Sequence, residues 1–195
     1  MKIGLTGSSG SGKSTVAAMF LLRGCHIVDC DRISRSIDAL PEYKAAVREK
    51  FGDGVFDDGG SIDRRALGKL VFENAELLSE LTAISHPIII SCVMEEIKKH
   101  GDENVVIDAP LLFESGLDKI CDVTVGVIAE HGVRAHRVSR RDGISEEDAA
   151  RRVSLQKSDD FYRNNCIFII ENDGTPEELR MCFDALAAKI GLERK

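Results

Sequence analysis

Short apolar runs and a helical pattern alternate at the start of the chain. The runs Lys2–Thr6 and Cys25–Cys30 have the length and apolar character of strands. Between them, apolar residues recur at helical spacing over Lys13–Arg23, and Gly24 follows where a C-terminal cap is expected. Such a strand–helix–strand unit favours two parallel strands joined by a right-handed crossover.

Three later apolar runs extend the predicted sheet. They are Val105–Ile107, Asp122–Ile128 and Cys166–Ile170. The last run is continuously apolar, which is typical of a strand buried on both faces of a parallel sheet. Together the runs predict an α/β fold in which a five-stranded parallel sheet lies between two layers of helices.

The stretch between the second and third predicted strands has a different pattern. Helical periodicity dominates residues 32–101, and two glycine-rich turns, Gly52–Gly54 and Asp58–Gly60, interrupt it. We therefore predict a helical insertion within the sheet-forming chain.

Two helix starts are predicted in the C-terminal part. Ser145 and Asp148 are similar to a capping box at the head of a helix that runs toward Gln156. Thr175 and Glu178 form a clearer capping box, with proline at the first helical position. The apolar stripe expected on the last helix consists of Leu179, Phe183, Leu186 and Ile190.

Composition narrows the class of protein. The chain has 195 residues, 43% of them hydrophobic, which suits one globular unit that carries a sub-domain. The formal net charge of -7 disfavours a nucleic-acid-binding surface, which usually carries a basic excess. The first strand begins at Lys2, which leaves no room for a signal peptide, and no apolar run approaches the about 20 residues of a membrane span. We expect a soluble, cytoplasmic protein.

The six cysteines fit a reducing compartment, because most lie in apolar runs and no CxxC pair occurs. Cys25, His26 and Cys30 are close enough in sequence to suggest metal ligands. Alternate residues of a strand point to opposite faces, so this run favours a buried strand over a metal site.

The clearest chemical motif is the run Gly7–Ser14, which fits the phosphate-binding pattern GxxxxGK[ST]. Glycines let the backbone approach phosphates closely, and the N-terminus of the following helix attracts anions. Lys13 is expected to contact the β- and γ-phosphates of ATP, and the Ser14 hydroxyl to bind Mg²⁺. The alternative, a glycine-rich surface turn, is disfavoured because the motif follows a strand and opens a helix. The predicted nucleotide-binding residues of this loop are Gly7, Gly10, Ser11, Gly12, Lys13, Ser14 and Thr15.

Other motifs indicate the class of P-loop protein. The chain lacks the Asn-Lys-x-Asp sequence of a GTPase and the Leu-Ser-Gly-Gly-Gln sequence of a transporter ATPase. A short chain with a helical insertion and an arginine-rich late segment instead fits a small-molecule kinase, which must close over two substrates to exclude water.

Several segments, in order and spacing over nearly the whole chain, resemble the dephospho-CoA kinase family. They are Gly4–Gly7, Asp29–Asp31, Ser61–Arg64, His86 with Pro87, Asp108–Glu114, Arg137, Arg141–Gly143, Arg152, Gln156 and Asn172–Gly174. The resemblance implies phosphoryl transfer from ATP to the ribose 3′-hydroxyl of dephospho-CoA, giving CoA and ADP. It also implies a P-loop kinase core (1–31, 102–130 and 166–195), a helical acceptor-binding insertion (32–101) and a lid (131–165).

Three carboxylates near strand ends are candidates for the chemistry. Asp31 lies just past a predicted strand, where α/β sites form, and we expect it to orient and deprotonate the ribose hydroxyl. Its alternative is a helix N-cap or an outer position around Mg²⁺. Asp29 is a secondary candidate beside Asp31, and its alternative role is that of a solvated carboxylate at the strand end. Asp108 ends a strand as a Walker-B-type carboxylate would, so we expect it to hold Mg²⁺ through water, with a loop-start role as its alternative.

The resemblance assigns further residues to the acceptor. Arg64 and His86 match family positions that line the acceptor site, although a histidine before proline often only caps a helix. Leu111, Leu112 and Phe113 are expected to pack against the acceptor, with a plain core role as the alternative.

The late segment supplies the remaining candidates. Arg137 and Arg141 are four residues apart and therefore share a helix face, from which guanidinium groups would stabilise the charge on the transferring phosphate. A solvated basic face is the alternative. Asn172 and Gly174 are expected near the adenine, with an ordinary turn as the alternative.

The chain departs from the family pattern after Gln156, because Tyr162 and Ile167 stand where the family usually has lysine and aspartate. We carry no role onto residues 157–165. Two other functions remain open: a nucleoside monophosphate kinase, which would need a different acceptor pocket, and a nucleotide-sensing module, which would bind ATP without rapid transfer. The expected partners are ATP and dephospho-CoA, without nucleic acid or membrane, and the expected state is a monomer or a weak homo-oligomer.

Overall fold

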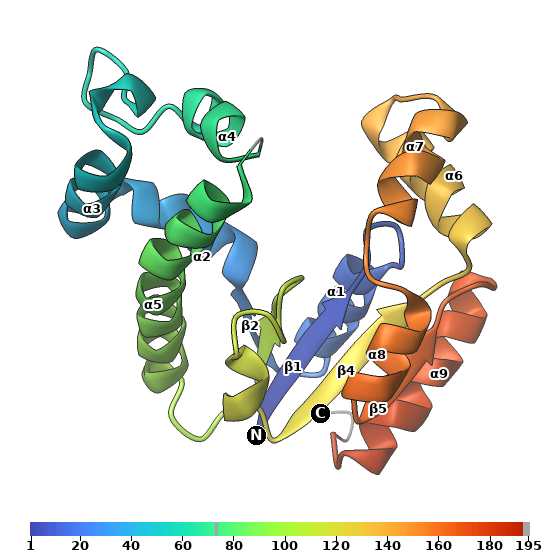
Figure 1. Ribbon diagram of the computed structural model, residues 1–195. Coiled ribbons are helices and arrows are strands. Elements are labelled where there is room, and N and C mark those ends of the chain that lie inside the picture. Colours follow the sequence, from blue (N-terminus) through green and yellow to red (C-terminus); the bar gives the residue numbers. More distant parts are fainter. Residues whose placement is uncertain (73, 193–195) are drawn as a thin grey trace. The chain divides into compact units, whose positions relative to one another are not determined.

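The computed structural model describes residues 1–72 and 74–192. Within this part of the chain, five strands form one parallel sheet in the order β2-β3-β1-β4-β5 (Figure 1), which confirms the predicted fold class. The strands are β1 (Lys2–Gly7), β2 (His26–Asp29), β3 (Val105–Asp108), β4 (Val123–Ile128) and β5 (Phe168–Glu171).

Helices occupy most of the remaining chain. The α-helices are α1 (Lys13–Leu22), α2 (Cys30–Ser36), α3 (Pro41–Phe51), α4 (Arg64–Phe72), α5 (Ala75–Lys99), α6 (His131–Asp142), α7 (Glu146–Ser154), α8 (Asp159–Asn165) and α9 (Pro176–Lys189). Short 3-10 helices are η1 (Ile37–Ala39), η2 (Asp53–Val55) and η3 (Leu117–Ile120).

Helices α1 and α9 cover one face of the sheet. Val16 and Phe20 of α1 and Phe183 of α9 belong to one buried cluster with Ile3 and Val125 of the strands. The rings of Phe20 and Phe183 meet edge to face, with centroids 4.8 Å apart. Each large side chain buried in this way contributes about 1.5–3 kcal/mol to stability. The predicted stripe of α9 lies on this face, since Leu179, Phe183 and Leu186 are buried and Ile190 packs beside them.

The opposite face of the sheet is approached closely by α8 and by the chain after β3. A Cβ on Gly126 of β4 would lie 2.9 Å from the sulfur of Cys166 and 3.3 Å from the Cβ of Tyr162. A Cβ on Gly4 of β1 would lie 2.8 Å from a methyl carbon of Leu112. Side chains at these two strand positions would therefore push both elements off the sheet.

Several strand ends differ by one or two residues from the sequence prediction, and helix caps explain two of these differences. The strand predicted over Cys25–Cys30 ends at Asp29, because the Asp29 carboxylate accepts a hydrogen bond from the Arg32 amide (2.9 Å) and Cys30 starts α2. The strand predicted from Cys166 begins at Phe168, because the Cys166 amide caps α8 by donating to the carbonyl of Tyr162 (2.8 Å).

The chain divides into two compact units. One comprises Met1–Val28 and the chain from His100 onward, and the other comprises Asp29–Lys99. The second unit has its own core, in which α5 packs against residues from α3, η2 and α4. The buried members of this core are Ile37, Tyr43, Val47, Val55, Ile62, Leu67 and Val71.

Among the described helices, α5 is long and apolar enough to cross a membrane by length and composition. The sequence prediction missed this helix because it considered only uninterrupted apolar runs. Little of this apolar stretch is fully buried, but several apolar residues of α5 are partly buried against the core of the Asp29–Lys99 unit. These packed residues include Leu77, Leu81, Ile84, Ile88, Ile89 and Cys92.

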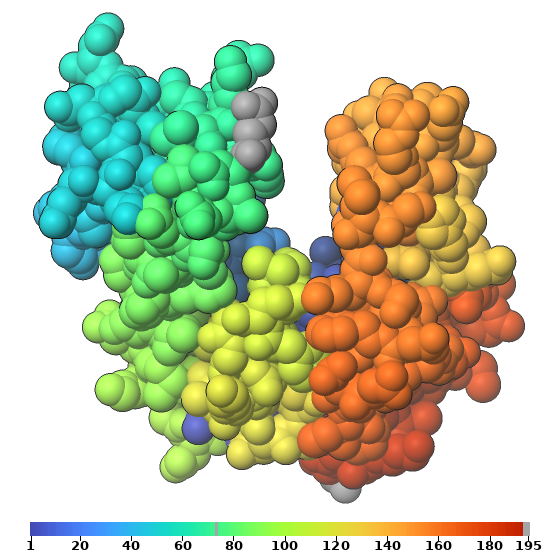
Figure 2. All heavy atoms as spheres, in the orientation of Figure 1, coloured from blue at the N-terminus to red at the C-terminus, as the bar shows by residue number. Residues whose placement is uncertain are grey.

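Helices α6 and α7 form a hairpin with a small core of its own. Val138 of α6 is buried with Ala149 and Val153 of α7. Figure 2 shows the hairpin, in yellow to orange, projecting from the rest of its unit. The predicted start of α7 is confirmed, because the Ser145 hydroxyl accepts a hydrogen bond from the Asp148 amide. The capping box of α9 at Thr175 and Glu178 is confirmed as well.

Candidate active site

The P-loop folds tightly at the end of β1, and its glycines are required by space and by backbone conformation. Gly10 and Gly12 have φ angles of 82° and 95°, in the region that favours glycine. A Cβ on Gly10 would lie 2.7 Å from the carbonyl oxygen of Arg134, and one on Gly12 would lie 2.2 Å from the amide nitrogen of Asn172. Gly12 also forms the N-cap of α1. The loop is therefore enclosed by residues that follow β4 and β5.

An ion pair joins the P-loop lysine to the predicted metal carboxylate. The ammonium group of Lys13 donates to Oδ1 of Asp108, and both side chains are largely buried. Strand register explains the pairing, because β3 runs parallel to β1 with Asp108 opposite Leu5. Both charged groups lie at the carboxyl ends of the strands, where the P-loop begins. The structure thus brings together two of the residues predicted for phosphate and metal binding.

Both predicted lid arginines reach the P-loop from α6. Arg137 Nη1 donates to the carbonyl of Asn172 (2.9 Å) and to that of Gly10 (3.3 Å). Arg141 Nη2 donates to the hydroxyl of Ser9 at 3.1 Å. Arg141 also bonds to its neighbour Asp142, which lowers the pKa of the Asp142 carboxyl. The helix face predicted from their spacing therefore points toward the phosphate-binding loop.

Asn172 contacts the P-loop through its side chain. It follows β5, is buried, and its amide nitrogen donates to the carbonyl of Ser11 at 2.7 Å. The Asn172 carbonyl at the same time accepts from Arg137. Gly174 lies two residues on, just before the N-cap of α9, where a Cβ would lie 2.0 Å from a carboxylate oxygen of Glu178.

The segment after α7 also contacts the P-loop, a role that sequence reasoning missed. The Ser9 amide donates to the side-chain oxygen of Gln156 (2.9 Å). The Ser8 hydroxyl shares its one proton between the hydroxyl of Tyr162 and the carbonyl of Lys157, each 3.3 Å away. Burial raises the pKa of the Tyr162 hydroxyl above its usual range. A serine followed by two aspartates, Ser158-Asp159-Asp160, was the available signal for α8, because it is a typical helix start.

Arg134 is a second residue that sequence reasoning missed. Its side chain on α6 is buried, and Nη2 lies 3.7 Å from Oδ1 of Asp159 on α8, which is too long for a hydrogen bond. Its Nε and Nη1 have no hydrogen-bond partner among the residues that the structure describes. A buried cation with so few partners is costly. Its position links the first turns of α6 and α8.

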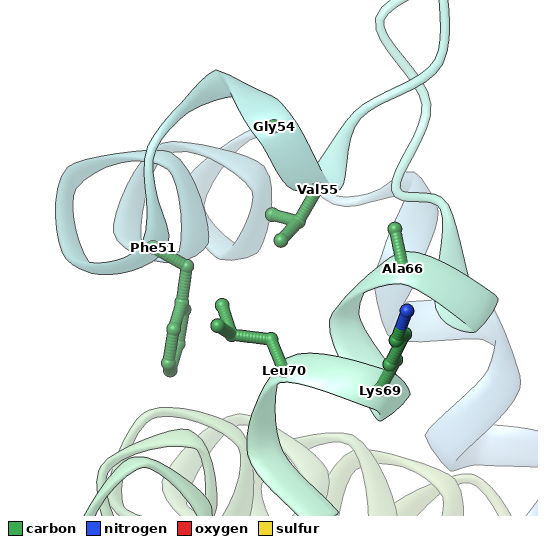
Figure 3. A pocket seen from close by; sticks show the side chains of 6 residues that line it. All are labelled: Phe51, Gly54, Val55, Ala66, Lys69 and Leu70. Atoms are coloured by element: carbon green, nitrogen blue, oxygen red, sulfur yellow. The ribbon is translucent and has the colours of Figure 1, made fainter.

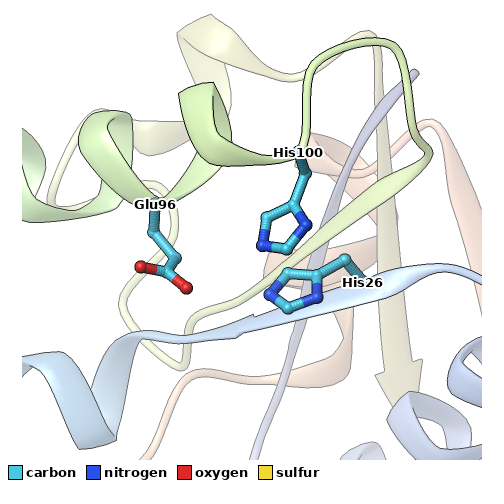
Figure 4. A group of neighbouring side chains, drawn as sticks. All are labelled: His26, Glu96 and His100. Atoms are coloured by element: carbon cyan, nitrogen blue, oxygen red, sulfur yellow. The ribbon is translucent and has the colours of Figure 1, made fainter.

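The other predicted site residues differ in their surroundings. Ser14 and Thr15 are exposed at the start of α1. Leu111 is 56% exposed, whereas Leu112 is completely buried against Gly4. For Leu112 this is the core role that the sequence left open. His26, weighed above as a metal ligand, stacks on the ring of His100 with centroids 3.3 Å apart (Figure 4).

The acceptor candidates Asp31, Arg64 and His86 belong to the Asp29–Lys99 unit. Asp31 is exposed in the first turn of α2, and Asp29 rather than Asp31 caps that helix. Arg64 donates from Nη2 to the carbonyl of Ser34 (2.9 Å) and from Nε to the Asp38 carboxylate. His86 is half-buried inside α5, so the helix-capping role weighed for it does not apply.

A cavity of about 500 Å³ opens within the Asp29–Lys99 unit (Figure 3). Apolar side chains and the ammonium group of one lysine surround it. Its lining residues are Phe51, Gly54, Val55, Ala66, Lys69 and Leu70. None of the acceptor candidates predicted from the sequence is among them.

Comparison with known proteins adds the family context. The sequence model of the family described as dephospho-CoA kinase matches residues 1–178. A dephospho-CoA kinase from Fusobacterium nucleatum is 37% identical over 179 residues, which span 92% of this chain and 93% of the relative. A dephospho-CoA kinase from Staphylococcus aureus is 36% identical over 196 residues, which span 99% of this chain and 95% of the relative.

Solved structures share the fold. A crystal structure of a Thermus thermophilus protein is 34% identical, covers 97% of both chains and superposes with a TM-score of 0.83. A dephospho-CoA kinase from Campylobacter jejuni, 24% identical, covers 97% of this chain and 98% of its own with a TM-score of 0.70. A shikimate kinase from Bacteroides thetaiotaomicron, 18% identical, covers 98% of both chains with a TM-score of 0.55 and supports the P-loop kinase fold alone.

Proposed function

The chain belongs to the dephospho-CoA kinase family, and from this premise we propose how its residues perform the reaction. It is a kinase that transfers the γ-phosphoryl group of ATP to the ribose 3′-hydroxyl of dephospho-CoA, giving CoA and ADP. The observation that carries the residue assignment is that Arg137 and Arg141 contact Gly10 and Ser9 of the P-loop, the loop that also supplies Lys13. These cations gather where the donor phosphates would bind.

The donor side is formed by the loop Gly7–Ser14. Its backbone N–H groups and the N-terminus of α1 attract the phosphates of ATP. We assign Lys13 to the β- and γ-phosphates, and Asn172 with Gly174 to the side of the loop where the adenine binds. Arg137 and Arg141 lie beside Gly10 and Ser9, where guanidinium groups stabilise the negative charge of phosphoryl transfer.

The donor set for Mg²⁺ fits its chemistry. Ser14 exposes a hydroxyl at the start of α1, and Asp108 offers a carboxylate at the end of β3. Hard oxygen ligands of this kind are those that Mg²⁺ prefers. When bound, the ion would neutralise charge on the β- and γ-phosphates.

The acceptor is assigned to the Asp29–Lys99 unit and to the loop after β3. Asp31 lies in the first turn of the helix that leaves the carboxyl end of β2, the end of a parallel strand at which α/β sites form. We assign it to orient the ribose hydroxyl and accept its proton. Arg64, His86 and the exposed Leu111 are assigned to bind the rest of dephospho-CoA.

The wider setting follows from the reaction. Its substrates are small molecules, so we propose a cytoplasmic enzyme that needs neither nucleic acid nor a membrane. A monomer or a weak homo-oligomer suffices, because both substrate sides are assigned to one chain.

One experiment tests the substrate assignment. The protein is incubated with ATP, Mg²⁺ and dephospho-CoA, and in parallel with AMP, CMP or GMP in place of dephospho-CoA, and the products are identified by mass. We expect CoA and ADP in the first reaction alone. Phosphate transfer to a nucleotide without formation of CoA would indicate a nucleoside monophosphate kinase. ATP binding without transfer to any acceptor would indicate a nucleotide-sensing module.

A further inference from the structure

One short segment, residues 156–162, contacts two loops that are assigned different functions. On one side it meets the P-loop, through Gln156 with Ser9 and through Tyr162 with Ser8. On the other side it meets the chain after β3, at Phe113 and Glu114. The proposed function assigns the first loop to ATP and the second to the acceptor.

Aromatic rings join the two contacts. The Phe161 ring meets the Phe113 ring edge to face, with centroids 5.7 Å apart and an interplanar angle of 85°. The Phe161 and Tyr162 rings meet in the same way at 5.4 Å. The Tyr162 hydroxyl then accepts the hydrogen bond from Ser8. Edge-to-face pairs hold a defined geometry and contribute about 0.5–1.5 kcal/mol each beyond burial.

Lys157 adds a charged contact to the chain after β3, beside the contact between Phe161 and Phe113. The ammonium group of Lys157 lies 3.6 Å from the Glu114 carboxylate and 4.8 Å from the centroid of the Phe161 ring. The carbonyl of Lys157 accepts from the Ser8 hydroxyl. Lys157 therefore forms a second link between the P-loop and the chain after β3, through its carbonyl oxygen and its ammonium group.

The segment rests on a rigid support. Tyr162 is only 4% exposed, and it packs over Gly126 of β4, where the missing Cβ allows the close approach. The Cys166 amide caps α8, and the Ile167 amide donates to the hydroxyl of Thr124 on the same strand (3.0 Å). Movement of the rings is thus restricted on the sheet side, so a displacement at one loop is passed to the other.

We propose that Phe161 and Tyr162 are positioning residues that couple the binding of ATP to the binding of the acceptor. ATP orders the P-loop around its phosphates, and the loop holds Tyr162 through Ser8. The ring contacts then fix Phe113 and the neighbouring Leu111–Glu114 loop in the arrangement that receives dephospho-CoA. Coupling of this kind is reciprocal, so dephospho-CoA favours ATP binding by the same factor. The inference rests on the proposed acceptor role of that loop.

Equilibrium binding tests the coupling directly. The affinity for dephospho-CoA is measured by calorimetry with and without a saturating, non-hydrolysable ATP analogue, and the ratio is the coupling factor. We expect the analogue to tighten binding to the unmodified protein. Phe161→Leu, which removes both ring contacts, is expected to reduce the coupling factor about threefold or more, within the range found for residues on coupling networks. Phe161→Tyr keeps the ring and is expected to preserve the factor.

Arg163→Ala is the matched control on the same helix. Arg163 pairs with Glu171 at 2.7 Å, and no hydrogen bond, ion pair or ring contact described for it involves the P-loop or the Leu111–Glu114 loop. Its coupling factor is expected to equal that of the unmodified protein. A loss of coupling in this variant would show that any disturbance of α8 has the effect, and would overturn the assignment to the rings.

The remaining outcomes separate the coupling from the proposed function. A coupling factor of one in the unmodified protein, or a factor unchanged by Phe161→Leu while both affinities fall, overturns the coupling. A third variant, Phe113→Leu, tests the acceptor end. If it leaves dephospho-CoA affinity unchanged while CoA is still formed, the acceptor role of the loop is wrong and the coupling fails with it, although the reaction stands. Failure of the unmodified protein to form CoA would instead reject the proposed function.

Discussion

The side-chain amide of Asn172 donates a hydrogen bond to the backbone carbonyl of Ser11 at 2.7 Å, although 161 positions separate the two residues in sequence. The bond joins the end of β5 to the P-loop at the end of β1. The intervening strand β4 pairs with both, so the sheet fixes the spacing across which Asn172 reaches. A residue expected near the adenine therefore also shapes the phosphate-binding loop.

Replacement of Asn172 by alanine should weaken ATP binding more than it lowers stability. The variant loses the bond to Ser11, so the buried carbonyl is left unsatisfied at a cost of about 1–3 kcal/mol. Part of this cost falls on the loop conformation, so we expect the KM for ATP to rise about tenfold or more. Steady-state kinetics with ATP as the varied substrate check this, with thermal unfolding as the stability readout. An unchanged KM with a lowered Tm would reduce Asn172 to a core residue.

Replacement of Asp31 by asparagine should abolish turnover while ATP binding survives. The asparagine keeps the size of the side chain but cannot accept the hydroxyl proton, and loss of a general base typically costs 10²–10⁴-fold in rate. Asp29→Ala is the neighbouring control, because the Asp29 side chain caps α2 and its loss should appear mainly as lower stability of about 1 kcal/mol. Turnover of Asp31→Asn within a few fold of the unmodified rate would reject the base assignment.

Arg137→Ala and Arg141→Ala should each lower kcat, because both guanidinium groups contact the P-loop. Removing one such charged donor is expected to cost about 10–10³-fold in kcat. Arg140 provides the control, since it lies exposed on the same helix and makes no described contact with the loop. Arg140→Ala should retain full activity. If all three variants lose only thermal stability, the role in phosphoryl transfer is wrong.

The sheet and the P-loop could be read from the sequence because both are local signals. Short β-branched apolar runs such as Val105–Ile107 favour a buried strand, and the loop motif is contiguous. The spacing of Arg137 and Arg141 correctly indicated one helix face. The partner of that face depends on the pairing of β4 with β1, because α6 follows β4 and the P-loop follows β1. No single segment of the sequence encodes this pairing.

The contacts of the segment 156–162 could not be predicted in the same way. Tyr162 reaches Ser8 because Gly126 leaves room on a strand distant in sequence, and the approach depends on three elements at once. Replacement of the usual family lysine by Tyr162 marked the place as unusual but gave no geometry. Helix α8 itself was missed because it is only 7 residues long, too short for an apolar stripe to show.

Thiol reactivity should distinguish the cysteines of the folded protein. Burial raises the pKa of Cys121 and of Cys166 to about 12, so their thiols stay protonated at pH 8 and the reactive thiolate is scarce. Cys182 is exposed on α9. Iodoacetamide should therefore label Cys182 first, as read by peptide mass, whereas all six cysteines should react in urea. Early labelling of Cys166 would contradict the packing of α8 on β4.

The pair Arg134 and Asp159 should show unequal costs when its members are removed singly. Asp159→Asn leaves a buried guanidinium without its nearest carboxylate, 3.7 Å away, whereas Arg134→Met removes the cation and fills its space with an apolar chain. Each variant leaves one charge without its partner, but the Arg134 side chain is 6% exposed whereas the Asp159 carboxylate is 30% exposed and can be hydrated. We therefore expect the larger loss, about 2 kcal/mol, for Asp159→Asn. Arg134→Met should cost less. Thermal unfolding of both variants, with Asp160→Asn as an exposed neighbour that should change little, measures the difference. A larger loss of Tm in Arg134→Met than in Asp159→Asn would mean that the guanidinium stabilises the fold through contacts other than this pair.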